Sequence, residues 1–164
     1  MSRPTSQQGA VRRATLELAR ADIGFSAGHF SIIDGHPERL HGHNYRVSVR
    51  ARGDIDNHGT VLDFHALKDA LRAVCHELDE HMLVPVQSTE MSVVNDDASV
   101  SVEVASRRYV FPREDVCLLP VVNSTCECLA AYLLTALRRR LGDIDVHLEV
   151  GVEELPGQGA VIEE

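Results

Sequence analysis

The sequence lacks three features that would each mark a particular class of protein. It is short of positive charge, because 16 Lys and Arg against 25 Asp and Glu leave a net charge of −9. Its basic residues are scattered rather than grouped on one predicted face, so we do not expect the protein to bind nucleic acid. Its 4 cysteines are too few and too irregularly spaced for a disulfide framework. No apolar run is as long as a membrane span or a signal-peptide core. We therefore expect a cytoplasmic protein that binds neither nucleic acid nor membrane.

The length of the chain bounds its domain organisation. At 164 residues it can bury one hydrophobic core but is too short for two ordinary domains. Residues 1–11 are polar and without periodicity, so we expect a mobile tail there. Residues 87–120 begin as a polar stretch and continue with alternating valines, which predicts an inserted hairpin. The sequence thus predicts a single domain over residues 1–164.

Periodicity indicates both strands and helices. Amphipathic stripes predict one helix after an N-cap at Asp63 and a second that starts near residues 123–125 and stops at Gly142. Apolar and polar residues alternate with the period of half-buried strands in the remaining segments. These predicted strands are residues 15–29, 41–52, 145–154 and 160–162. This order of elements is typical of an α+β fold.

Two histidines at the start of a predicted strand have the spacing of a metal chelate. His41 and His43 are two positions apart, so their side chains project to the same face of the sheet. Neutral imidazoles suit zinc, and a catalytic zinc site typically has three protein ligands and one open position. Four other histidines are candidates for the third ligand: His29, His36, His58 and His65. We prefer His29, because it lies at a strand end on an otherwise apolar parity.

Glu127 and Glu154 each have a structural and a functional interpretation. Glu127 stands three residues after Ser124, as in a capping box. Glu154 continues the apolar parity of Val150 and Val152, which directs it inward. A buried carboxylate needs a partner to offset its desolvation, and a heterocycle with a guanidine-like edge of N–H donors can supply one.

Further charged residues lie close to these elements. Asp79, Glu80 and His81 follow the first predicted helix and form either an acid/base pair or, as composition favours, a solvated helix end. Glu38, three residues before His41, would be interpreted as an ordinary surface charge if its neighbours were ignored. Its nearness to the candidate metal site makes it a functional candidate as well.

Taken together, five segments resemble motifs of the 6-pyruvoyl-tetrahydropterin synthase and 6-carboxy-tetrahydropterin synthase family. They occur in family order over about residues 15–163, and H-G-H-N-Y with an upstream F-S-A-x-H is a specific combination. The segments are Phe25–His29 (F-S-A-x-H), His41–Tyr45 (H-G-H-N-Y), Val61–Phe64 (the start of the first helix), Ser124–Glu127 (S/T-T-x-E) and Val150–Glu154 (V-x-V-x-E).

This resemblance implies a fold, an assembly and a metal. The fold is the tunnelling fold, or T-fold, in which an antiparallel four-stranded sheet carries two helices on one face. Subunits of the family associate into a barrel, which implies a homo-oligomer, either a trimer or a dimer of trimers. The resemblance also implies that His29, His41 and His43 hold zinc.

The resemblance further implies a pterin substrate and residues that bind it. Glu154, with Glu127 and Thr125, would anchor the pterin ring by its pyrimidine edge. The sequence departs from the family at Leu155, where a threonine usually follows the anchoring glutamate.

The two remaining departures concern catalysis. The family's catalytic cysteine position is Pro37 here, while Glu38 creates the E-x-x-H-G-H pattern of a variant that resembles synthases making 6-hydroxymethyl-7,8-dihydropterin. The family's Leu-Asp-His reads Leu-Asp-Glu-His, so either His81 or Glu80 joins Asp79 in the proton relay.

These observations lead to a sequence-based hypothesis: a zinc-dependent lyase or synthase acts on the side chain of 7,8-dihydroneopterin or its triphosphate, with Glu38 as the general base or acid and Asp79 with His81 as the relay. To serve near neutrality, a carboxylate base needs a pKa raised by burial. The alternatives are a 6-pyruvoyl- or 6-carboxy-tetrahydropterin synthase and a zinc- or pterin-binding protein that has lost catalysis.

Overall fold

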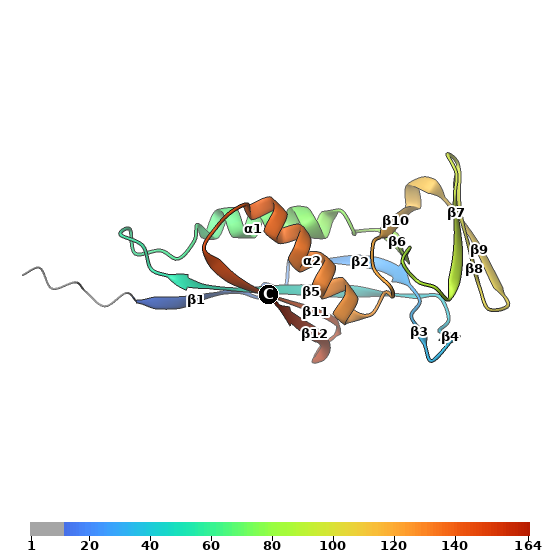
Figure 1. Ribbon diagram of the computed structural model, residues 1–164, viewed down its shortest axis with the longest axis horizontal. Helices are drawn as coiled ribbons and strands as arrows, with labels where there is room; N and C mark the ends of the chain where they lie inside the picture. Colours follow the sequence, from blue (N-terminus) through green and yellow to red (C-terminus); the bar gives the residue numbers. More distant parts are fainter. Residues whose placement is uncertain (1–11) are drawn as a thin grey trace, which may run out of the picture.

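The main sheet of the protein is built around one long strand (Figure 1). In the computed structural model, which describes residues 12–164, this strand is β5 (His41–Asp54). It pairs antiparallel with three neighbours: β1 (Arg13–Leu18), β2 (Gly24–His29) and β11 (Val146–Leu155). The sheet has seven strands, in which β10 (Val116–Leu119), β6 (His81–Pro85), β2, β5, β11 and β12 (Gln158–Glu163) follow one another and β1 pairs beside β5. The predicted tail, residues 1–11, lies outside the described residues.

The segment predicted as one strand, residues 15–29, forms two. A turn closed by a 3.1 Å hydrogen bond from the Ile23 amide to the Arg20 carbonyl separates them. Both pieces then pair with the same edge of β5, because Leu18 lies opposite Val49 and Gly24 lies opposite Arg46. One predicted strand therefore supplies two strands of the sheet.

The main sheet is also not purely antiparallel, so the predicted four-stranded antiparallel sheet was wrong in strand number and in direction. Its outer strands are β6 (His81–Pro85), β10 (Val116–Leu119) and β12 (Gln158–Glu163). Strand β6 pairs parallel with both β2 and β10. Its last four residues are all buried, and a strand buried on both faces shows no alternation by which the sequence could have revealed it.

Two helices cover one face of this sheet (Figure 1). Helix α1 (Phe64–His76) begins after Asp63, whose carboxylate accepts a 2.8 Å hydrogen bond from the His65 amide. Helix α2 (Cys126–Leu141) ends at Gly142, where φ is 72°. The predicted apolar stripe of α1 is fully buried, as are Leu129, Leu133 and Leu137 of α2. Among residues 12–164, no helix is long and apolar enough to cross a membrane.

The start of α2 differs from the predicted capping box. Thr125 is the N-cap, and its hydroxyl accepts a hydrogen bond from the Cys128 amide. The Ser124 hydroxyl instead donates a 2.8 Å bond to the Phe30 carbonyl. Glu127 is therefore the second residue of the helix rather than the third, which removes it from capping-box register.

The insertion at residues 87–120 is larger than the predicted hairpin. It forms a three-stranded antiparallel sheet and then a short 3-10 helix that leads into β10. The alternating valines of its central strand pack in a second hydrophobic core with Phe30 and Ile32. The elements are β7 (Met91–Asn95), β8 (Ser99–Val104), β9 (Arg107–Pro112) and η1 (Arg113–Asp115). This inserted sheet stands at the opposite end of the molecule from β1, next to a small hairpin of β3 (Ile32–Ile33) and β4 (His36–Pro37) (Figure 1).

Candidate functional site

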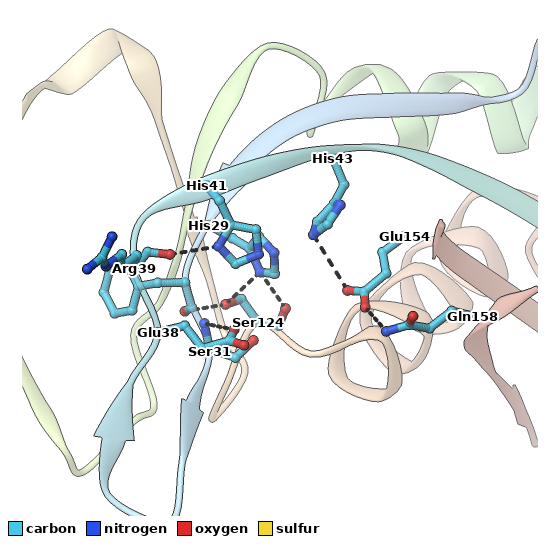
Figure 2. A network of polar contacts seen from close by, with 10 residues as sticks. His29, Ser31, Glu38, Arg39, His41, His43, Ser124, Glu154 and Gln158 are labelled. Atoms are coloured by element: carbon cyan, nitrogen blue, oxygen red, sulfur yellow. Dashed lines mark hydrogen bonds and ion pairs between the residues drawn. The ribbon is translucent and has the colours of Figure 1, made fainter. Parts of the chain in front are cut away.

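Three histidines meet on the helix-covered face of the sheet, where β2 and β5 pair. His29 lies opposite His41 in the register, and His43 is two residues further along β5. Each offers a ring nitrogen, and these atoms lie within 4.8 Å of one another. The His29 ring centroid is 4.5 Å from that of His41 and 5.3 Å from that of His43 (Figure 2). By contrast, His36, His58 and His65 lie outside this cluster.

The hydrogen bonds of two imidazoles make them suitable metal ligands. His29 Nδ1 lies 3.0 Å from the Ser124 carbonyl oxygen, and His41 Nδ1 lies 2.7 Å from the Arg39 carbonyl oxygen. A carbonyl can only accept, so both Nδ1 atoms carry the proton and both Nε2 atoms keep a free lone pair. His29 Nε2 is buried and has no hydrogen-bond partner among residues 12–164. Burial and the adjacent His41 lower the pKa of His29, which favours the neutral ring that binds metal. The three residues therefore fit a metal ion that prefers imidazole ligands.

A cavity of about 250 Å³ opens beside the histidines. Four residues that the family resemblance assigned to catalysis or substrate binding share it with His41. They are Glu38, Thr125, Glu127 and Glu154. The structure thus gathers residues from the β3–β4 hairpin, the start of α2 and the end of β11 into one space.

Glu38 follows the β3–β4 hairpin directly. The Asp34–Gly35 turn of this hairpin has φ values of 49° and 75°, the left-handed pair that a tight two-residue turn requires. The hairpin folds Glu38 back against Ser31. The Glu38 amide donates a 2.9 Å bond to the Ser31 carbonyl, and the Glu38 carboxylate accepts one of 3.3 Å from the Ser31 amide (Figure 2).

Glu154 is half-buried and faces the histidine cluster. Its Oε2 lies 3.9 Å from His43 Nε2, and its Oε1 accepts a 2.7 Å hydrogen bond from the Gln158 side-chain amide (Figure 2). The expectation that Glu154 needs a partner did not anticipate Gln158. The turn through Gly157, where φ is 82°, brings Gln158 back beside the end of β11.

Cys126 is a second cavity residue to which the sequence assigned no function, because a single Cys-x-Cys pair is weak evidence for a metal site. Its thiol lines the same cavity as Glu38 and Glu154. Burial, and then the charges of Glu154 and Glu127, raise the pKa of Cys126 to about 11. The thiol is thus protonated at neutral pH, which makes it a poor nucleophile and a poor base there.

Asp79 and His81 lie apart from this cavity. The Asp79 carboxylate accepts a 2.8 Å hydrogen bond from the Ser26 amide, and His81 Nδ1 lies 2.6 Å from the Asp79 carbonyl oxygen. Glu80 has a left-handed backbone, with φ at 59°, and its amide bonds to the Ser26 carbonyl. Glu80 and His81 line a wider groove with Ser26 and Asn44, and His41 and His43 also contribute to it. Within a single chain, the Asp79–His81 pair therefore lies outside the cavity that Glu38 lines.

Fold and site together define a class of protein, an α+β domain with a three-histidine candidate metal centre beside an acidic cavity. The model of the 6-pyruvoyl tetrahydropterin synthase family matches residues 19–164, so the chain belongs to this family. The predicted α+β class and tunnelling fold are confirmed by the crystal structure of the 6-pyruvoyl tetrahydropterin synthase of Plasmodium vivax. That structure has a TM-score of 0.88 and 31% identity and covers 93% of this chain and 98% of its own.

Relatives in sequence carry a different name within the same family. A candidate 6-carboxy-5,6,7,8-tetrahydropterin synthase of Methanocaldococcus jannaschii is 32% identical over 147 residues, which is 85% of this chain and 89% of that protein. The 6-carboxy-5,6,7,8-tetrahydropterin synthase of Aquifex aeolicus is 29% identical over 114 residues, or 69% of this chain and 64% of that protein. A catalytic-residue mutant of the P. vivax enzyme, with glutamate replaced by alanine, is also similar, with a TM-score of 0.88, 30% identity, and coverage of 93% of this chain and 98% of that one.

Proposed function

We propose that this protein is a zinc-dependent pterin synthase that shortens the side chain of 7,8-dihydroneopterin or its triphosphate to give 6-hydroxymethyl-7,8-dihydropterin. The observation that carries the proposal is the position of Glu38, which shares a cavity with His41 where the family's cysteine position is occupied by Pro37. The mutated catalytic residue of the P. vivax relative is also a glutamate. We assign the corresponding catalytic function in this chain to Glu38.

The metal would be held by Nε2 of His29, His41 and His43. In His29 and His41 this atom is free to bind, because the Nδ1 atom carries the proton and donates it to a backbone carbonyl. Zinc bound there supplies Lewis-acid polarisation of a substrate oxygen. The protein's own contribution is to keep the imidazoles neutral and correctly oriented.

Glu154 is the proposed anchor of the pterin ring, assisted by Glu127 and Thr125. The pyrimidine edge of a pterin presents adjacent N–H donors, which pair with a carboxylate through charge-assisted hydrogen bonds. The bond from Gln158 holds the Glu154 side chain in place at the cavity wall. This arrangement orients the ring so that its side chain extends toward Glu38.

Glu38 is the proposed base; it is exposed in the single chain, so the burial that such a base requires would have to come from the bound substrate. Glu38 removes the proton from the hydroxyl on the second side-chain carbon, the bond between the first and second carbons breaks, and the second carbon leaves as an aldehyde. The electron pair stays on the first carbon, and a returned proton completes the hydroxymethyl group. Cys126 is not assigned this role because its raised pKa keeps it protonated. Asp79 and His81 stay predicted relay residues, since neither lines the cavity that holds Glu38 in the single chain.

A second candidate function is that of a 6-carboxy-5,6,7,8-tetrahydropterin synthase. It is favoured by the names of the M. jannaschii and A. aeolicus relatives. The same metal and the same pterin anchor would serve this reaction. The two functions differ in their products.

The test is product analysis with a matched pair of variants. Zinc-loaded protein is incubated with dihydroneopterin and with its triphosphate, and products are identified by mass. Glu38→Gln is expected to lower turnover by about 10²- to 10⁴-fold, the usual contribution of a general base, while zinc content and pterin binding persist. Glu114→Gln, at an exposed position in η1, serves as the control.

Three outcomes would overturn parts of this proposal. A carboxy-pterin product replaces the first function by the second. Unchanged turnover in Glu38→Gln removes Glu38 from catalysis. Pterin binding without turnover in the zinc-loaded wild type identifies a binding protein.

A further inference from the structure

Arg107 connects the inserted sheet to the residue proposed as the base. It is the first residue of β9, and its Nη1 donates a hydrogen bond to the backbone carbonyl of Glu38 across 69 positions of sequence. The next residue, Arg108, makes a different contact, since it pairs at 3.6 Å with the exposed Glu103 of β8. Two consecutive arginines on one strand thus have different environments.

The peptide groups of Glu38 are held on both sides. Its amide donates to the Ser31 carbonyl, and its carbonyl accepts from Arg107. Among residues 12–164, these are the hydrogen bonds that fix its backbone. Loss of the arginine would leave the carbonyl side of Glu38 without a protein partner.

The other arm of the hairpin is held independently. Phe30 is buried and stacks on Tyr109 of β9, with ring centroids 5.4 Å apart. The Asn123 side chain bonds both backbone groups of Ile32, at 3.1 and 2.8 Å. Removing the Arg107 side chain would leave these contacts and the second core in place, so its effect would be confined to the arm that carries Glu38.

We propose that Arg107 is a positioning residue for Glu38, and that the inserted sheet thereby takes part in the reaction. A guanidinium is a charged and planar donor, so its bond to a carbonyl is stronger and better oriented than one from a neutral group. The inference rests on the proposed role of Glu38. Catalytic groups act within narrow geometric limits, and a misplacement of about 1 Å can lower a rate by about 10²-fold.

The experiment compares Arg107→Met, Arg107→Lys and Arg108→Met in the full zinc-loaded chain. We expect Arg107→Met to lower kcat by about 10- to 100-fold, with KM, pterin binding and zinc content changed less than about twofold. Arg107→Lys should recover part of the rate, because an ammonium can still donate one bond to the carbonyl. Arg108→Met should match the wild type.

A double variant separates positioning from a general structural role. If Arg107 acts through Glu38, adding Arg107→Met to Glu38→Gln should lower kcat by less than about twofold. A fully multiplicative loss would overturn the proposal, as would wild-type kcat in Arg107→Met. If Arg107→Met does not fold, Arg107→Lys with a kcat below that of Arg108→Met supports the proposal, and equal values refute it.

The same set of variants distinguishes this inference from the proposed function. Unchanged turnover in Glu38→Gln would refute the base assignment, whatever Arg107 does. Reduced turnover in Glu38→Gln with wild-type turnover in Arg107→Met would refute the positioning role alone.

Discussion

The candidate site has two parts that are held in different ways. The histidine cluster stands on paired strands of the main sheet, where His29 lies directly opposite His41. Glu38 lies outside that sheet on a hairpin arm fixed by Ser31 and by Arg107 of the inserted sheet. The strand register determines where the imidazoles lie, whereas contacts made by a separate unit determine where the carboxylate lies. Metal binding and proton transfer should therefore respond to different mutations.

The largest expected effect is on the histidine cluster. His41→Ala removes one of three clustered imidazoles from an exposed position, so the fold should persist. Loss of residues that merely support a metal ligand costs about 10- to 100-fold in affinity, and loss of a ligand should cost at least about 100-fold. Zinc titration checks this, with the exposed His36→Ala as the control. Full zinc affinity in His41→Ala would show that this residue is not a ligand.

A second prediction compares the cost of truncating a side chain in each of the two hydrophobic cores. Leu133 is fully buried in the main core and Val102 in the second core. Leu133→Ala should cost about 2–5 kcal/mol of unfolding free energy and Val102→Ala about 2 kcal/mol, from lost transfer energy and the cavities left behind. Urea denaturation measures both values.

The two cores should also differ in their effect on catalysis under conditions where each variant is folded. Val102→Ala loosens the sheet that carries Arg107 and should lower kcat, while zinc affinity stays at the wild-type value. Leu133→Ala should leave kcat nearly unchanged. The opposite pattern would contradict the separation of the two parts.

The smallest effect is expected at the C-terminal end of the main sheet. Hydrogen bonds from Arg138 lower the pKa of Glu164 below its ordinary value of 4.5. A lowered folded-state pKa stabilises the fold above the unfolded value, and this contribution is lost as pH falls through the folded-state pKa. Glu164→Gln should therefore cost below about 1 kcal/mol at neutral pH, since the pair is partly exposed.

This difference from the wild type should shrink as pH falls below 4.5 and should leave kcat unchanged at neutral pH. Denaturation of the metal-free protein at several pH values measures it. A stability difference that does not depend on pH would exclude the ion pair as its cause.

Several features of the fold were predictable because they depend on local periodicity. Both helices begin close to their predicted residues, and α2 ends at the predicted Gly142, since the Asp63 cap and Gly142 are local signals. The parity that placed His29 with buried neighbours is also local, as side chains alternate along any strand. By contrast, Thr125 rather than Ser124 caps α2 because the Ser124 hydroxyl bonds to Phe30, a residue 94 positions away.

By itself, the sequence determined the two helices, the buried faces of the strands and the spacing of His41 and His43, because each depends on a repeat of two or 3.6 residues that neighbouring positions carry. Only the tertiary structure decided that β6 runs parallel to β2, that Gln158 supports Glu154 and that Arg107 holds Glu38. The parallel pairing and the Arg107 contact join distant parts of the chain, and the Gln158 bond depends on a turn. None of the three leaves a periodic trace in sequence. Thus the spacing of the histidines could be recognised locally, whereas the support of the proposed base emerged only when the inserted sheet folded against its hairpin.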